Sequence, residues 1–310
     1  MAEGSTLRPP AQGISSLENP IFGIDHGGFH TQTKQQQALD KMATFGGFQC
    51  PACGAPIFVR EASLCCEKGH TYDVARKGYV HLHHRTVISP YDKELFAARR
   101  AVFDAGFYQP VIKALEEVLT PLAPATLLDA GCGEGYYLSS LSPALPHSNL
   151  IGIDLSKEAI LSAAGRGGSS LYCVGDLNRL PFQDSVFDVV LNILSPASYA
   201  SFTRVLRKDG MLIKIMPGRE YLQEIRRRLP EAKAGYDDTR VPEYLQQHMQ
   251  VIRMERLRYT LPLSPALYAC FIAMTPLTES LSDKERDLLL QDPPDEITID
   301  LQLAVCRTAI

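Results

Sequence analysis

The sequence has no long, uncharged apolar stretch, and its first residues show no signal-like pattern. A transmembrane helix needs about 20 consecutive apolar residues, and a secretory signal needs a shorter apolar core after a positive start. We therefore expect no membrane span, no secretion and a cytoplasmic location. Apolar residues make up 45% and charged residues 21% of the 310 positions, which is ordinary for a globular chain of one large and one small domain.

The sequence also lacks a strong net charge. The formal charge of −4 gives no field over the whole molecule that would attract nucleic acid. Between residues 47 and 100, however, there are eight Lys and Arg against five Asp and Glu. Within the basic segment 76–85, strand-like alternation puts Tyr79, His81 and His83 on one face. An RNA-binding face and an ordinary solvated strand face both fit this pattern.

The eight cysteines do not form a set typical of a disulfide framework, because half of them are scattered singly through apolar segments. The others cluster upstream. Cys50 and Cys53 form a knuckle whose two thiolates can share one metal ion, and Cys66 and His70 complete a Cys₃His set suited to structural zinc. Cys65 and Cys66 cannot easily point at the same ion. We choose Cys66, because the turn at Gly69 can then bring His70 round.

Three acidic residues end three successive apolar runs. The first, Asp129, leads the glycine stretch 129–135, whose pattern acid-x-Gly-x-Gly-x-Gly differs from the dinucleotide fingerprint in its third spacing. Its glycines, Gly131, Gly133 and Gly135, let backbone N–H groups approach a ligand. Tight turns alone explain one such loop but not three acids on three strand ends. The pattern predicts S-adenosylmethionine: Asp129 for its amino group, Asp154 for its ribose and Asp176 for its adenine amine.

Apolar runs and helical patterns alternate along the rest of the chain. We expect strands over 126–128, 149–154, 170–175, 187–193 and 211–216, and helices over 94–105, 111–119, 157–164 and 198–206. The segments 251–261 and 296–307 alternate like an edge pair of strands around a helix at 267–274. This order predicts an α/β class I S-adenosylmethionine methyltransferase with a Rossmann-like, seven-stranded, mainly parallel sheet and a small N-terminal zinc-binding module.

The composition divides the chain into three regions. Residues 1–46 are rich in Gly, Pro, Ser, Thr and Gln and are expected to be a disordered leader, with a short helix over 35–42 as the alternative for that part. Residues 47–90 are expected to be a zinc-binding RNA-recognition module. Residues 91–310 are expected to be the methyltransferase domain.

Several blocks together resemble the ribosomal large-subunit (23S) RNA guanine-N1 methyltransferase family, including its macrolide-resistance branch. The resemblance covers roughly residues 48–307 and rests on His70-Thr71-Tyr72-Asp73, Lys77-Gly78-Tyr79-Val80, Arg99-Arg100, 104–110, 129–137 and Met274-Thr275-Pro276. It implies a target guanine in a 23S RNA hairpin loop, an effect on macrolide sensitivity, and the same four zinc ligands. It also implies cofactor contacts at Tyr108, Tyr137, Leu138 and Tyr221, although the family commonly has His at the last position. As partners we expect the RNA hairpin and, optionally, a second copy of the chain in a homodimer.

The segment after the fourth strand narrows the chemistry. It contains no polar-Pro-Pro-aromatic turn to grip an exocyclic amine, and no Cys nucleophile for carbon methylation. Ring-nitrogen methylation remains, and no residue is identified as its general base, so the catalytic residue stays unknown. Asn192, Ser195 and Pro196 fit both a base pocket and a plain turn. The full expected cofactor set is Tyr108, Asp129, Gly131, Gly133, Gly135, Tyr137, Leu138, Asp154, Leu155, Asp176, Leu177, Asn192 and Tyr221.

Two other functions use the same features. A small-molecule methyltransferase has the same kind of fold and glycine loop, and fold alone does not decide function. A zinc-dependent RNA-binding protein without turnover would have the same zinc-binding module. The basic segment 76–85 argues against the first, and the complete set Asp129, Asp154 and Asp176 argues against the second.

Overall fold

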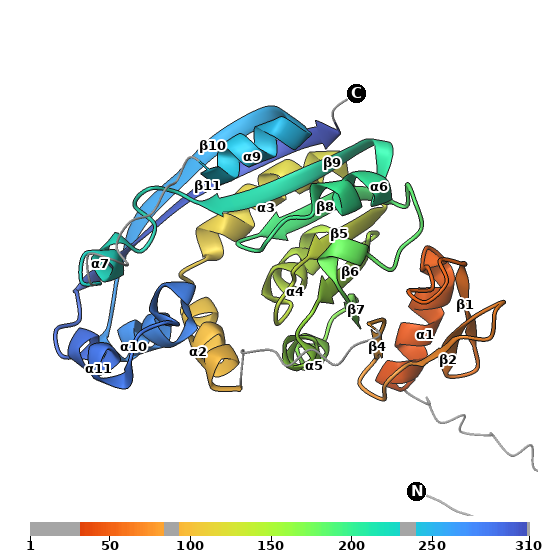
Figure 1. The fold of residues 1–310 in the computed structure, drawn as a ribbon, viewed down its shortest axis with the longest axis horizontal. Coiled ribbons are helices and arrows are strands. Elements are labelled where there is room, and N and C mark those ends of the chain that lie inside the picture. Colours follow the sequence, from red (N-terminus) through yellow and green to blue (C-terminus); the bar gives the residue numbers. More distant parts are fainter. Residues whose placement is uncertain (1–31, 84–92, 230–239, 309–310) are drawn as a thin grey trace, which may run out of the picture. The chain divides into compact units, whose positions relative to one another are not determined.

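The computed structural model describes residues 32–83, 93–229 and 240–308 (Figure 1). Thr33–Ile310 forms one compact unit. Within the described residues, no helix combines the length and the apolar character needed to cross a bilayer.

An eight-stranded sheet with the order β10-β11-β9-β8-β5-β6-β7-β4 forms the centre of this unit. Its strands from β9 to β4 pair in parallel, whereas β11 and β10 are added as a long antiparallel pair at one side (Figure 1). The strands are β4 (Tyr79–His81), β5 (Thr126–Ala130), β6 (Asn149–Asp154), β7 (Leu171–Val174), β8 (Phe187–Ile193), β9 (Leu206–Pro217), β10 (Met249–Pro262) and β11 (Glu296–Thr308). Parallel order aligns the carboxyl ends of β5, β6 and β7, where the three expected acids stand.

Helices cover both faces of this sheet because alternate strand residues point to opposite sides. One buried cluster contains Leu127 and residues of α3, α4, α5 and α10, while the other contains Leu128 and residues of α1, α6 and α9. The helices are α1 (Lys34–Phe45), α2 (Lys93–Asp104), α3 (Gln109–Leu122), α4 (Tyr136–Leu141), α5 (Lys157–Gly165), α6 (Tyr199–Val205), α7 (Gln223–Arg226), α9 (Arg240–His248), α10 (Pro265–Met274) and α11 (Asp283–Leu290).

Local sequence signals set several of these helix starts. The Ser156 hydroxyl accepts from the Ala159 N–H at the start of α5, and Ser282 with Glu285 forms a capping box at the start of α11. Pro110 occupies the first turn of α3, where its missing N–H leaves no bond unmade. The starts of α3 and α5 agree with the helices expected from sequence to within a few residues, whereas the sequence analysis predicted no helix at the position of α11. The alternating residues of β11, which are Ile297, Ile299, Leu301, Leu303 and Val305, are all buried.

The cysteine-rich region folds as a small three-stranded antiparallel sheet of β1 (Ile57–Arg60), β2 (Ser63–Cys66) and β3 (Thr71–Asp73). We call this small sheet with its cysteine-bearing turns the ribbon. The expected boundary between the ribbon and the next domain, at residues 90 and 91, lies outside the described residues. The strand that comes after the ribbon, β4, leaves it and pairs with β7, which makes it the eighth strand of the main sheet. The seven strands expected for the methyltransferase sheet are therefore present, and the eighth comes from the N-terminal region.

The expectation of a disordered leader through residue 46 is wrong for its last part. Lys34–Phe45 forms helix α1, capped by the Thr33 hydroxyl and ended by Gly46 in the left-handed conformation. Ala38, Leu39 and Met42 on this helix are buried in the same cluster as ribbon and sheet residues. The composition of the segment is polar, so its order depends on burying these few apolar residues against distant parts of the chain. The rest of the expected leader, residues 1–31, lies outside the described residues.

Candidate functional site

Asp129 is buried at the end of β5, with 1% of its surface exposed. Neither of its carboxylate oxygens has a hydrogen-bond partner among the described residues. Burial, together with the nearby Asp154 carboxylate, raises the pKa of Asp129 to about 8. A buried carboxylate without a donor is costly, so the site suits a ligand that brings a positive group with N–H donors. The amino group of S-adenosylmethionine has that chemistry.

Asp154 ends β6 beside the glycine loop and has backbone partners. One carboxylate oxygen accepts the Gly133 N–H at 2.9 Å, and the other accepts the Ser156 N–H at 2.8 Å. Burial raises the pKa of Asp154, and these N–H groups oppose that rise. Because each carboxylate oxygen can accept more than one bond, Asp154 keeps room for the hydroxyl groups of a ribose while it fixes the loop.

The glycine loop depends on glycine at each expected position. Gly131, Gly133 and Gly135 all have positive φ, at +87°, +52° and +73°. A Cβ on Gly131 would lie 2.7 Å from the Cβ of Ser195, and one on Gly135 would lie 2.6 Å from the Tyr172 hydroxyl. Backbone conformation therefore disfavours side chains at all three positions, and neighbouring atoms also exclude them at Gly131 and Gly135.

The third acid occupies a more open position. Asp176 follows β7, is partly exposed, and accepts the Asn178 N–H at 2.8 Å. Leu177 lies next to the loop, 3.7 Å from a Cβ built on Gly131, and Leu155 is 37% exposed directly after Asp154. Two apolar side chains beside two acids provide surfaces suited to an adenine ring and its amine.

The aromatic residues expected from the resemblance come together from three separate segments. The hydroxyl groups of Tyr108 and Tyr221 are 2.6 Å apart. Burial, with Tyr221 as neighbour, raises the pKa of both Tyr108 and Tyr137 well above the usual value. Leu138 is fully buried in α4, so its side chain belongs to the core and only its backbone is suited to a ligand contact.

Asn192 differs from the expectation of a direct cofactor contact. Its side chain is fully buried, and its amide N–H groups donate to Ala130 O at 2.7 Å and Pro196 O at 3.1 Å. Its carbonyl oxygen accepts from Lys214 Nζ. Because all these groups are bonded inside the protein, the Asn192 side chain holds the neighbouring backbone in place. Lys214 was missed from sequence, although a lone lysine within the apolar run 211–216 is a signal.

A second group missed from sequence supports the loop from its other side. Glu134 is buried, and Arg166 binds its carboxylate at 3.1 Å and its backbone oxygen at 2.9 Å. Arg99 lies 3.8 Å from the same carboxylate, and its guanidinium is within 3.8 Å of a Cβ built on Gly133. Burial raises the pKa of Glu134, and the two arginines oppose this. The Arg99-Arg100 block is thus connected to the loop through Arg99.

The ribbon brings Cys50, Cys53, Cys66 and His70 together, with their ligand atoms all within 4.8 Å of one another. The Sγ atoms of Cys53 and Cys66 are 3.8 Å apart, and His70 Nδ1 is 3.3 Å from Cys66 Sγ. Zinc–sulfur bonds of about 2.3 Å in a tetrahedron place two sulfurs about 3.8 Å apart. Cys65 instead approaches the Thr71 hydroxyl. The geometry therefore fits one tetrahedral zinc ion and excludes Cys65 from it.

The strand after the ribbon shows the expected alternation. Val80 and Leu82 are buried, whereas Tyr79, His81 and His83 are partly exposed. Burial lowers the pKa of His81, and His83 and Lys157 act in the same direction. Positions 84 and 85 of the basic segment lie outside the described residues. Because β4 is parallel to β7, His81 and His83 lie at the same edge of the sheet as Asp176.

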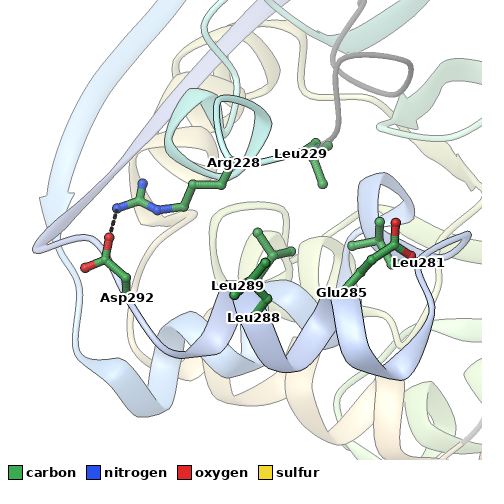
Figure 2. A pocket seen from close by; sticks show the side chains of 7 residues that line it. All are labelled: Arg228, Leu229, Leu281, Glu285, Leu288, Leu289 and Asp292. Atoms are coloured by element: carbon green, nitrogen blue, oxygen red, sulfur yellow. Dashed lines mark hydrogen bonds and ion pairs between the residues drawn. The ribbon is translucent and has the colours of Figure 1, made fainter.

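A hollow of about 440 Å³ lies elsewhere, between the end of α7 and helix α11 (Figure 2). Figure 2 shows Leu229, Leu288 and Leu289 along it and Arg228 directed at Asp292, 3.4 Å away. The described residues that line it include no strand-end acid and no member of the glycine loop. We therefore place the candidate site at the carboxyl ends of β5, β6 and β7.

Comparison with known proteins gives matches over both regions. Residues 128–214 match the family described as "Methyltransferase domain", and residues 48–83 match the one described as "RlmA, N-terminal". The 23S rRNA (guanine(748)-N(1))-methyltransferase of Streptomyces fradiae is 30% identical over 84% of this chain and 96% of its own length. YxjB of Bacillus subtilis (strain 168), whose name assigns it provisionally to the 23S rRNA (guanine-N(1)-)-methyltransferases, is 35% identical over 86% of this chain and 99% of its own length.

Proposed function

The chain belongs to the 23S rRNA guanine-N1 methyltransferase family, and we propose on that premise that it transfers a methyl group from S-adenosylmethionine to N1 of one guanine in 23S rRNA. The observation that carries this proposal is the buried Asp129 carboxylate, whose two oxygens lack a donor among the described residues. An RNA-modifying role also implies a cytoplasmic location.

The cofactor supplies an electrophilic methyl group when it is bound. Asp129 would hold its ammonium group, Asp154 its ribose hydroxyls and Asp176 its adenine amine. Gly131, Gly133 and Gly135 would allow the backbone to approach it, while side chains or backbone groups of six other residues would border it: Tyr108, Tyr137, Leu138, Leu155, Leu177 and Tyr221. Asn192 would shape the site from behind rather than touch the cofactor.

Ring-nitrogen methylation requires that the guanine is placed in line with the methyl group and that N1 loses its proton. Orientation of bound reactants can supply up to about 10 kcal/mol of barrier reduction. Buried tyrosines such as Tyr108 and Tyr137, whose pKa values are raised, stay protonated near neutral pH and can donate but not remove a proton there. We assign no general base.

The ribbon would present the RNA. Cys50, Cys53, Cys66 and His70 would hold one structural zinc ion, which folds β1, β2 and β3. Since β4 connects this ribbon to the edge of the catalytic sheet, Tyr79, His81 and His83 would lie where an RNA hairpin reaches the methyl group. The hairpin loop as target, an effect on macrolide sensitivity and a homodimer belong to the same proposal.

The test is transfer of tritiated methyl from S-adenosylmethionine to large-subunit RNA from cells that lack the protein. We expect label in 23S RNA and a reverse-transcriptase stop one nucleotide before a guanine, because an N1 methyl blocks the pairing edge. Label on an exocyclic amine, or a stop at another base, would contradict the N1 assignment. Binding of RNA and cofactor with no label would favour an RNA-binding protein without turnover. Label only in small molecules would favour the small-molecule methyltransferase.

A further inference from the structure

Lys214 occupies an unusual position for a lysine. It lies in the middle of β9 with 3% of its surface exposed, on the sheet face that carries the apolar residues Leu212, Met216 and Ala304. No ion pair joins it to a carboxylate within the described residues. The titratable group that faces it is the Cys306 thiol of β11. Burial lowers the pKa of Lys214 to about 8. An ammonium group in such a layer costs stability unless its donors are bonded.

The hydrogen bonds of Lys214 go to the end of β8 and the turn that follows it. Its ammonium group donates to the Asn192 side-chain oxygen and, at 3.1 Å, to the backbone oxygen of Ser195. Asn192 in turn donates to Ala130 O and to Pro196 O. The lysine therefore connects β9 to the turn after β8 and to the end of β5, where Ala130 stands between Asp129 and Gly131.

That turn touches the glycine loop and is itself strained. Leu194 has φ +49°, a left-handed conformation that is unfavourable for a residue other than glycine. Ser195 stands so close to Gly131 that no side chain fits on the glycine. A buried ammonium and a strained backbone at the same turn both cost stability, and such costs concentrate where a functional geometry must be held.

The same bonds hold the backbone of the turn in place. The backbone oxygens of Ser195 and Pro196 accept from Lys214 and Asn192, respectively. Two consecutive carbonyl groups of the turn are therefore fixed by one buried network.

We propose that Lys214 is a positioning residue, which acts directly on Ser195 and through Asn192 on Pro196 to fix the Ser195–Pro196 turn against the glycine loop. The proposal deepens the proposed function and rests on it for the reaction. Its structural part, the fixing of the turn, stands independently of the substrate.

The structural part is tested by hydrogen exchange of the full chain. Lys214→Met has nearly the same length without the charge, and we expect at least tenfold faster amide exchange over residues 194–198 with unchanged exchange in β5 and β6. Lys208→Met, at an exposed position of the same strand, is the matched control. The calorimetric Kd for S-adenosylmethionine should change by less than threefold, because Asp129 and Asp154 are untouched. If Lys214→Met does not fold, Lys214→Gln serves in its place.

The catalytic part is tested with large-subunit RNA. For Lys214→Met we expect kcat to fall 10- to 100-fold with KM for RNA nearly unchanged. The double variant with Asn192→Leu should lose no more than the worse single variant, because both act through one network. Unchanged exchange and unchanged kcat, or losses of kcat, cofactor binding and Tm in parallel, would overturn the proposal. If the wild type methylates no RNA, the proposed function fails while the exchange result still decides the role of Lys214.

Discussion

At the scale of single residues, the two neighbouring acids Asp129 and Asp154 differ in their surroundings. Asp154 receives two backbone N–H groups, whereas Asp129 receives none from the described residues. Asp154 is therefore already organised as part of the loop, whereas Asp129 would gain its partner from a ligand. This difference leads to two separate predictions.

The first prediction concerns Asp154→Ala. Loss of the carboxylate removes the acceptors for the ribose hydroxyls and frees the Gly133 N–H, so binding of S-adenosylmethionine should weaken by ~1.5–3 kcal/mol, or about 10- to 150-fold in Kd. Isothermal titration calorimetry measures this directly. Asp209→Ala, at an exposed position, is the control and should bind like the wild type. Wild-type affinity in Asp154→Ala would refute the ribose assignment.

The second prediction concerns pH and Asp129. Its pKa is raised to about 8, so without ligand the carboxyl holds a proton at neutral pH. Pairing with the cofactor's ammonium requires the ionised form, so binding releases a proton and affinity should rise with pH, by up to about tenfold per unit. The rise should extend from pH 6 to about 7.5 and then end as the cofactor's amine begins to lose its own proton. In Asp129→Asn, titrations across this range should show weak and pH-independent binding. A wild-type Kd that does not change between pH 6 and 7.5 would exclude this pairing.

At the scale of elements, β4 belongs to two structures. It follows the ribbon directly in sequence, and Val74 in the ribbon bridges to Val80 in β4. Its ladder, however, is with β7, and the Leu82 N–H continues it by donating to Val174 O at 2.8 Å. The ribbon and the main sheet also share one buried cluster. The two regions are thus joined by packing as well as by the chain.

The third prediction follows from this arrangement. Zinc removal by a chelator should unfold β1, β2 and β3, because a structural zinc ion contributes about 10–16 kcal/mol to the folding of small metal sites. β4 should stay protected from hydrogen exchange through its bonds to β7, and cofactor binding should persist while RNA methylation is lost. Exchange measured by mass spectrometry tests both parts.

Variants provide the control for this experiment. Cys53→Ser should reproduce the effect of the chelator, whereas Cys65→Ser should retain one zinc ion per chain, since Cys65 lies outside the cluster. Equal zinc content in Cys53→Ser and the wild type would show that Cys53 is not a zinc ligand and would contradict the assigned site. Loss of cofactor binding together with zinc would show that the ribbon and the sheet fold as one cooperative unit.

At the scale of the whole molecule, Thr33–Ile310 forms one compact unit with two buried clusters, one on each face of the eight-stranded sheet. Helix α1 is part of that unit, because Lys34 donates to Ala164 O at 3.2 Å and Lys41 donates to Ser169 O at 2.7 Å. This compact unit therefore includes residues well before the first cysteine.

The fourth prediction uses this boundary. A chain that starts at Thr33 should have the same Tm as the full chain within about 2 °C, because the unit that buries the core is complete. A chain that starts at Gly47 loses the buried Ala38, Leu39 and Met42, and its Tm should fall by at least 5 °C. Differential scanning calorimetry of the three chains decides this. Equal Tm values for all three would restore the expectation of a leader through residue 46.

Sequence alone determined the elements and the chemistry that depend on short distances along the chain. Apolar runs located the main strands and alternating apolar residues the last two, the four zinc-site residues stand within 21 positions of one another, and the glycine loop with its strand-end acids identified the cofactor class. Such signals are local because periodicity, capping and ligand spacing act over a few residues.

Only the tertiary structure decided the features that join distant segments. The pairing of β4 with β7, the order of α1 and the Tyr108–Tyr221 contact each connect residues separated by about 90 or more positions. The isolation of Asp129 and the bonds of Lys214 to Asn192 and Ser195 also come from packing. A residue's partners and its exposure to water are set by which elements close around it, and no local pattern records that choice.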